Sequence, residues 1–172
     1  CGRLGLVVNI HTGLGANPRF NITGSDPLLL ERLVDHPDSH ATKFVLVHGG
    51  WPFEAQAGAM LFKPNVYADI SAHVFLQPPG VVADTLYRWL SFAPEKVLFG
   101  TDTFPSALFG DDDPLIDWEE KAWLTVRTGR SALATALQRM LDDRLVSREG
   151  ALRIARMVLR DNARQLYGLD AP

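Results

Sequence analysis

The stretch "GLVVNIHTGLG", residues 5–15, decides the fold, because an apolar β-branched run there ends in a histidine followed by glycines. Three later runs share this plan, and each stops at a polar or glycine exit. They are "TKFVLVH" at 42–48, "PNVYADIS" at 64–71 and "EKVLFGTD" at 95–102. The pattern predicts four β-strands.

Segments with helical spacing separate these runs. The stretch at 26–36 opens with Asp26 as a helix N-cap and Pro27 at the first helical position. Residues 53–62 and 80–94 carry apolar stripes at helical period. Strands that are apolar on both faces and alternate with helices predict an α/β fold with a parallel sheet covered by helices.

Alternation along each strand predicts which side chains share a face, and the polar member always comes last. The three sets are Val7, Asn9 and His11; Phe44, Leu46 and His48; and Leu98, Gly100 and Asp102. Parallel strands end at one edge of a sheet, and ligands bind at that edge. We therefore expect His11, His48 and Asp102 to meet there.

Two imidazoles and a carboxylate converging from separate strands suit a divalent ion of the zinc type. Each residue alone has a commoner use. A strand-end histidine is more often a hydrogen-bonded core or loop residue, and Asp102 in "GTD" is equally suited to capping a turn. Three such groups at one edge favour the metal site.

The other three histidines fit the site less well. His36 and His40 lie in the polar turn "DHPDSHA", which predicts surface positions. His73 follows the third strand and could approach the site, but the pattern leaves its direction open.

Composition excludes some classes of partner. The 172 residues are 47% hydrophobic with a formal net charge of -3, so there is no basic face for nucleic acid. No apolar run approaches the roughly 18 residues that predict a membrane span. One cysteine cannot form an intrachain disulfide, which agrees with the expected cytoplasmic location but also with many secreted proteins. Because residue 1 is Cys and strand-like residues follow at once, we expect further sequence upstream.

Strand signals stop at about residue 113, and amphipathic helices are expected from there on. Their ranges are 113–129, starting at Asp113, then 131–146 and 147–169. Ser147 and Asp161 are candidate N-caps, and Gly168 is a candidate helix end. Residues 1–172 are thus expected to form a single domain or part of one, with a βα portion at 1–112 and a helical closing portion at 113–172.

Five motifs in order resemble one known family. The motifs are "NIHTGLG", "FVLVHGGWPF", "PNVYADIS", "KVLFGTDTFP" and "NARQLYGL". Together, over residues 5–169, they resemble the carboxyl-terminal half of the amidohydrolase superfamily, in the amidohydrolase-related branch. That branch also contains non-oxidative decarboxylases and nodulin-like domains fused to glutamine synthetase.

The resemblance implies a fold and a set of roles. The fold is the carboxyl-terminal half of a distorted (β/α)8 TIM barrel, with strands 5 to 8, their helices and a helical tail. His11 and His48 then bind metal or polarise the substrate, and Asp102 binds metal and shuttles the proton, so His48 and Asp102 are the catalytic pair. Asp69 and Ser71 either line the pocket or make a structural hydrogen bond.

The implied activity is metal-dependent hydrolysis of an amide, ester or lactone by a metal-activated water, with zinc as the expected ion. A metal-dependent decarboxylase and a catalytically idle binding or assembly module remain as alternatives. Trp51, Phe53 and Phe104 are candidate apolar walls of a pocket for a small-molecule substrate, or plain loop packing.

The sequence departs from the family in one large respect. The family's strand 1 carries a His-x-His pair, and no such pair occurs in these 172 residues. An open half barrel exposes sheet edges, so the expected partner is the missing amino-terminal half or another copy of the chain in a homo-oligomer. For the chain by itself we expect weak metal binding and no turnover.

Overall fold

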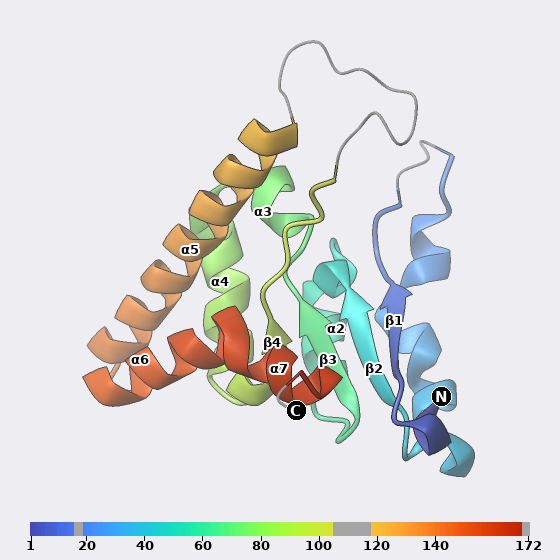
Figure 1. The fold of residues 1–172 in the computed structure, drawn as a ribbon. Coiled ribbons are helices and arrows are strands. Elements are labelled where there is room, and N and C mark those ends of the chain that lie inside the picture. The colour runs from blue at the N-terminus through green and yellow to red at the C-terminus, as the bar shows by residue number, and fades with distance from the viewer. Residues whose placement is uncertain (16–18, 105–117, 170–172) are drawn as a thin grey trace.

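A computed structural model describes residues 1–15, 19–104 and 118–169. Four parallel strands form one sheet in the order β1-β2-β3-β4 (Figure 1). The strands are β1 Val7–His11, β2 Lys43–Val47, β3 Val66–Asp69 and β4 Val97–Leu98. Each lies inside one of the four runs predicted as strands, so the α/β class with a parallel sheet is confirmed.

Helices and short 3-10 turns connect the strands and form the carboxyl-terminal part of the described chain. Before β3 these are η1 Gly2–Leu4, η2 Ile22–Ser25, η3 Pro27–Leu30, α1 Glu31–Val34, η4 Pro37–Ser39, η5 His48–Gly50 and α2 Glu54–Met60. After β3 they are α3 His73–Leu76, α4 Pro79–Leu90, η6 Pro94–Lys96, α5 Trp118–Asp142, α6 Arg148–Arg156, the π-helical η8 Met157–Asp161 and α7 Asn162–Tyr167.

The helices predicted between strands are confirmed, although the first is short. The Asp26 carboxylate accepts a hydrogen bond from the backbone N–H of Leu28 at 2.9 Å, so it caps as predicted. The segment after it begins as the 3-10 turn η3 and continues only briefly as α1. Helix α2 lies within the first of the two ranges expected from the apolar stripes, and α4 begins one residue before the second range, at Pro79, and ends within it.

The predicted break between two helices near residue 130 is wrong, because α5 runs through it without interruption. Gly129 lies inside this helix and is buried. A Cβ on Gly129 would lie 2.7 Å from the Phe99 ring, so the glycine permits close packing of α5 on the segment after β4. The predicted helix start at Asp113 lies outside the described residues.

Two of the three predicted helix boundaries in the tail are confirmed. The Ser147 hydroxyl accepts a hydrogen bond from Gly150 N at 3.1 Å, and Gly168 ends α7 with φ 66. Asp161 is not an N-cap: its backbone is helical and its side chain makes no capping bond. The π-helical η8 carries the chain from α6 into α7 at this point. The expected boundary between residues 112 and 113 lies outside the described ranges.

The register assigns the strand residues to two faces. The core face packs against the helices and carries Val8, Ile10, Phe44, Leu46, Val66, Ala68 and Val97. The His11 face carries Val7, Asn9, His11, Val45, Val47, Tyr67, Asp69 and Leu98. Helix α7 crosses in front of the sheet in Figure 1, where Leu166 and Ala163 pack against the apolar residues of the His11 face.

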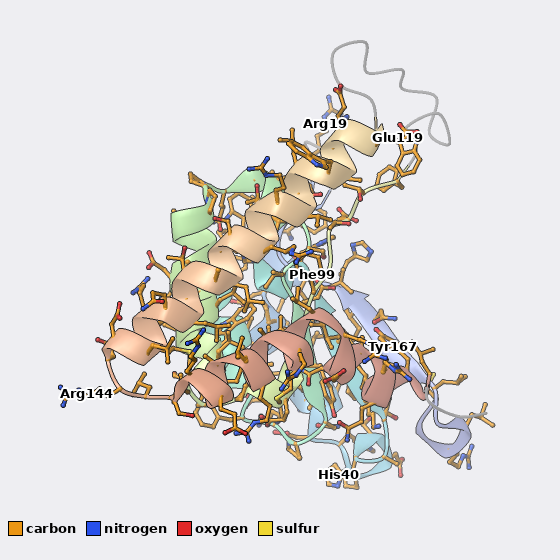
Figure 2. The ribbon with its side chains drawn as sticks, turned by 60° about the vertical axis from the view of Figure 1, so that its left-hand side comes forward. Arg19, His40, Phe99, Glu119, Arg144 and Tyr167 are labelled. Atoms are coloured by element: carbon orange, nitrogen blue, oxygen red, sulfur yellow. The ribbon has the colours of Figure 1, made fainter. Side chains whose placement is uncertain are left out.

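The carboxyl-terminal helices also form hydrogen bonds with backbone groups of β4 and of residues on either side of it. The Asn162 side-chain amide donates to the carbonyls of Pro94 and Val97, both at 2.8 Å, and Phe99 N donates to the carbonyl of Val158 at 3.1 Å. Figure 2 shows this tail lying across the sheet, with Phe99 and Tyr167 labelled. The arrangement is consistent with part of a TIM barrel; the half barrel itself stays a prediction.

None of the helices formed by the described residues has the length and apolar character required to cross a bilayer.

Candidate functional site

His11 and His48 meet at the carboxyl edge of the sheet. Thr12, one residue past the end of β1, donates both its backbone N–H (3.1 Å) and its hydroxyl (2.9 Å) to the carbonyl of Val47. This ties the ends of β1 and β2 together. His11 Nδ1 then lies 3.0 Å from His48 Nε2, and the two rings meet edge to face with centroids 4.7 Å apart.

His48 reaches this position by leaving the strand pattern. Phe44 and Leu46 point to the core face, so continued alternation would bury His48 on that face and away from His11. Strand β2 ends at Val47 instead, and His48 adopts the left-handed φ of 68. The predicted shared face for Phe44, Leu46 and His48 is therefore wrong at its last member. The predicted meeting of His48 with His11 is nevertheless correct.

Contacts from β3 and α3 hold the His48 backbone in this conformation. The Asp69 carboxylate accepts from His48 N at 3.0 Å, and the His73 ring nitrogen Nε2 donates to the His48 carbonyl at 2.8 Å. The next residue, Gly49, also has a positive φ of 51. A Cβ there would lie 2.5 Å from the Trp89 ring and 2.8 Å from the Asp69 carbonyl, so the turn requires glycine.

The second nitrogen of the His48 ring is also bonded. His48 Nδ1 lies 2.9 Å from Ser71 Oγ, in a buried contact. Ser71 Oγ and Ser71 N both donate to Asp69 Oδ1, the latter at 2.9 Å. Both Asp69 and Ser71 thus act on the candidate site, and they do so through hydrogen bonds.

His73 is fully buried beneath the site and packs edge to face against Trp89. Burial lowers its pKa, an effect larger than the opposing influences of its hydrogen bond to the His48 carbonyl, of Glu54 and of Asp69. A neutral ring that donates from Nε2 to the His48 carbonyl agrees with that shift. His36 and His40 are exposed, as predicted.

Asp102 does not join the two histidines. Its side chain is exposed, and its backbone has φ 58 in the irregular segment that follows β4. Strand β4 is only two residues long, so the chain has left the sheet before Asp102. Among the residues that the structure describes, no three His, Cys, Asp or Glu side chains are grouped to hold a metal ion. Asp102 as the third ligand stays a prediction.

The two histidines do fit a shared divalent ion. Two imidazole nitrogens bound to a tetrahedral zinc at about 2.0–2.1 Å are roughly 3.3–3.4 Å apart. The observed separation of 3.0 Å between His11 Nδ1 and His48 Nε2 is close to that value. Metal-binding histidines normally donate their other ring N–H to a neighbouring group, and Ser71 is such a neighbour for His48.

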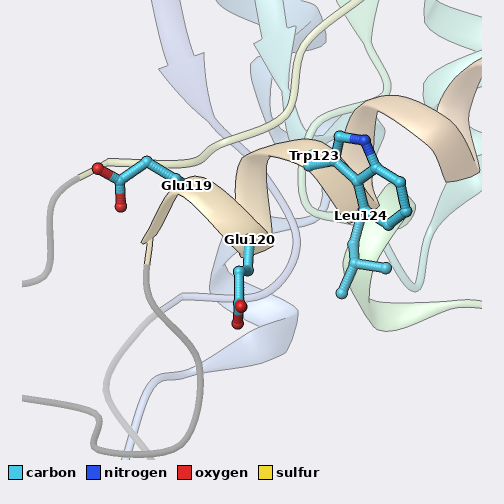
Figure 3. Close-up of a pocket in the computed structure, with 4 residues that line it drawn as sticks. All are labelled: Glu119, Glu120, Trp123 and Leu124. Carbon is cyan, nitrogen blue, oxygen red and sulfur yellow. The ribbon is translucent and has the colours of Figure 1, made fainter.

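An open surface hollow of about 440 Å³ lies at the start of α5, lined by Glu119, Glu120, Trp123 and Leu124 (Figure 3). Its lining comes from a single helix, whereas the histidine pair is built from separate strands. None of its lining residues was predicted as a site residue. The predicted pocket walls lie elsewhere: Trp51 and Phe53 are half-buried, and Phe104 is exposed.

Comparison with known proteins adds a family to this geometry. The amidohydrolase family matches residues 1–169, so the chain belongs to that family. No curated protein matches the sequence.

Two solved structures resemble the chain. A protein from Lactobacillus casei ATCC 334, provisionally classed as a metal-dependent hydrolase, superposes with a TM-score of 0.78 at 20% identity, covering 98% of this chain and 40% of that one. The chain thus spans well under half the length of that structure and shares its fold. An amidohydrolase from Burkholderia multivorans gives a TM-score of 0.47 at 18% identity, covering 76% of this chain and 46% of that chain.

Proposed function

We propose that the protein is a metal-dependent hydrolase in which His11 and His48 bind one divalent ion at the carboxyl edge of the sheet. The observation that carries the proposal is the 3.0 Å approach of His11 Nδ1 to His48 Nε2 from two neighbouring strands. Membership of the amidohydrolase family supports it. The scissile bond is an amide, ester or lactone, and zinc is the proposed ion.

The residues of the chain have separate tasks in this proposal. A divalent ion bound here would lower the pKa of a coordinated water to about 7 and would polarise a carbonyl. His11 and His48 would hold and orient that ion. The buried His48 would fix the position of the ion, because the backbone and the ring of His48 are both hydrogen-bonded. Asp102 serves as the base that accepts a proton and returns it to the leaving group.

The described residues supply two converging ligands, which is fewer than a catalytic zinc site uses. We therefore infer that further ligands come from the missing amino-terminal half of the barrel or from another copy of the chain. Strand β1 lies at the edge of the sheet, where a further strand can pair with it. The 172-residue chain alone should bind metal weakly and show no turnover.

The test is metal content and affinity, measured by elemental analysis and by titration with zinc, manganese and cobalt. His11→Ala and His48→Ala should each weaken binding at least about tenfold, because each removes a ligand. Asp102→Ala should also weaken metal binding about tenfold if Asp102 is the third ligand. His36→Ala is the matched control, since His36 is exposed and away from strand ends, and it should change nothing.

When the further ligands are supplied by an amino-terminal half or another copy, hydrolysis of amide, ester and lactone panels should require the ion that binds, whereas the 172-residue chain alone should show none. The proposal fails if the protein binds no metal after supplementation, or if His36→Ala weakens binding as much as His11→Ala does.

A further inference from the structure

The direction of the hydrogen bonds around Ser71 determines where the protons lie. An ionised carboxylate only accepts hydrogen bonds, so Asp69 Oδ1 takes the single hydroxyl proton of Ser71. The Ser71 oxygen can then only accept from its neighbour, His48 Nδ1, at 2.9 Å. It follows that Nδ1 carries the proton of a neutral His48 ring and that Nε2 carries a lone pair.

This lone pair faces the candidate site, because His48 Nε2 is the atom that lies 3.0 Å from His11 Nδ1. The same Asp69 oxygen also accepts from His48 N at 3.0 Å and from Ser71 N at 2.9 Å. One carboxylate therefore holds both the backbone that turns His48 toward His11 and the hydroxyl that orders its ring.

We propose that Ser71, anchored by Asp69, is a positioning residue that holds His48 as the Nδ1–H tautomer, with its Nε2 lone pair presented to a cation beside His11. The chemical purpose of this arrangement rests on the proposed function, but the tautomer itself does not. Binding of an ion then requires a change only at His11, whose ring proton moves from Nδ1 to Nε2. His48 is ready before the ion arrives.

Removal of the Ser71 hydroxyl should release this preference. In Ser71→Ala, Nδ1 loses its acceptor, and the remaining contact with His11 Nδ1 fits either tautomer because the His11 nitrogen can donate or accept. Zinc affinity should fall about tenfold, as is usual when the partner of a metal-binding histidine is lost. In Ser71→Thr the hydroxyl remains, so the tautomer preference and the zinc affinity should both match those of the native protein.

The tautomer is read by long-range proton–nitrogen NMR of the protein labelled with nitrogen-15 histidine, at about pH 8, where an ordinary imidazole is neutral. The His48 signals are assigned from their loss in His48→Asn. The native protein should show a protonated Nδ1 and an unprotonated Nε2. Ser71→Ala should shift both signals toward an average or the reverse pattern. Ser91→Ala should not, because that exposed hydroxyl donates to the Arg88 carbonyl at the carboxyl end of α4.

The native spectrum tests the inference without the Ser71 variants, so the inference can be overturned even if Ser71→Ala fails to fold. A native His48 with its proton on Nε2 would overturn the inference even if the protein binds metal. An unchanged spectrum in folded Ser71→Ala would do the same. Loss of the tautomer preference in Ser71→Ala with recovery in Ser71→Thr supports it, even if the protein proves to bind no metal and the proposed function fails.

Discussion

The core face and the His11 face are made from alternate residues of the same four strands, yet different structures cover them. Seven strand residues of the core face are apolar, and they pack in one cluster with the helices. The His11 face has a small apolar cluster under α7 and then polar groups toward the carboxyl edge. Leu46 is 0% exposed, whereas Val47, the next residue, is half-buried.

This difference means that the core face mainly stabilises the fold, whereas the carboxyl edge of the His11 face carries the residues proposed to bind the ion. Apolar burial on the core face supplies the free energy that keeps the sheet folded. At the carboxyl edge of the His11 face, His11 is exposed. His48 is hydrogen-bonded there by Asp69, Ser71 and His73. Substitutions on the core face should therefore change stability most, and substitutions at the edge should change ion binding most.

The largest expected effect is at Leu46, compared with its neighbour Val47. Leu46→Ala should lower the free energy of unfolding by about 2–5 kcal/mol, because it leaves a cavity in the core cluster. Val47→Ala should cost less than half as much, because the side chain is already half-exposed. Urea unfolding measures both values. Equal losses at the two positions would contradict the division between the faces.

A second comparison uses two glycines. Gly49→Ala should cost about 1–3 kcal/mol, because φ is 51 and the new Cβ would meet Trp89 and the Asp69 carbonyl. It should also weaken zinc binding by moving His48. Gly80→Ala is the control, since nothing lies within 4 Å of its Cβ position in α4, and it should be neutral or slightly stabilising. Zinc affinity unchanged in folded Gly49→Ala would show that the turn does not position His48.

The pattern of the sequence predicts the strands well because period-two apolar runs are local signals. The existence and order of all four strands, the caps at Asp26 and Ser147 and the end at Gly168 follow from such signals. The helix start assigned to Asp161 fails because a π turn needs no cap to continue, and nothing local distinguishes the two cases.

The candidate site is only partly predictable for a related reason. Strand ends bring His11 and His48 to one edge, but the face of His48 depends on a turn of three residues with positive φ, His48, Gly49 and Gly50, where the strand stops. Two glycines after a histidine, as in "HGG", could have signalled such a turn. The roles of Ser71 and His73 depend on contacts with a residue more than twenty positions away, which no local pattern encodes.

A third prediction concerns the pH dependence of stability beneath the site. Burial lowers the pKa of His73 below its ordinary value of about 6.5. The unfolded chain therefore binds a proton on His73 at a higher pH than the folded chain does. Stability is fully present above about pH 6.5 and decreases as the pH falls below that value.

His73→Gln removes this titration while the amide can still donate toward the His48 carbonyl. The hydrogen bond to the His48 carbonyl, Glu54 and Asp69 oppose the lowering of the pKa, and the charge of the His48 ring adds to it, so all three residues remain in place in the comparison. Urea unfolding of both proteins between about pH 5 and pH 8 should show the native protein losing its advantage over His73→Gln on acidification. A constant difference across that range would mean that His73 titrates equally in both states.

The smallest expected effect lies where α7 meets the His11 face. The Tyr167 hydroxyl donates to Asn9 Oδ1 at 2.8 Å and links the carboxyl-terminal helix to β1 across 158 positions of the chain. Tyr167→Phe keeps the ring and removes only this partly exposed bond, so the cost should be below about 1 kcal/mol. If amide exchange in Tyr167→Phe is faster in β1 and unchanged in helix α4, which packs in the core, then the loss of stability is confined to the His11 face. Faster exchange throughout the sheet and helices would mean that the bond stabilises the whole fold, and that the two faces do not respond separately.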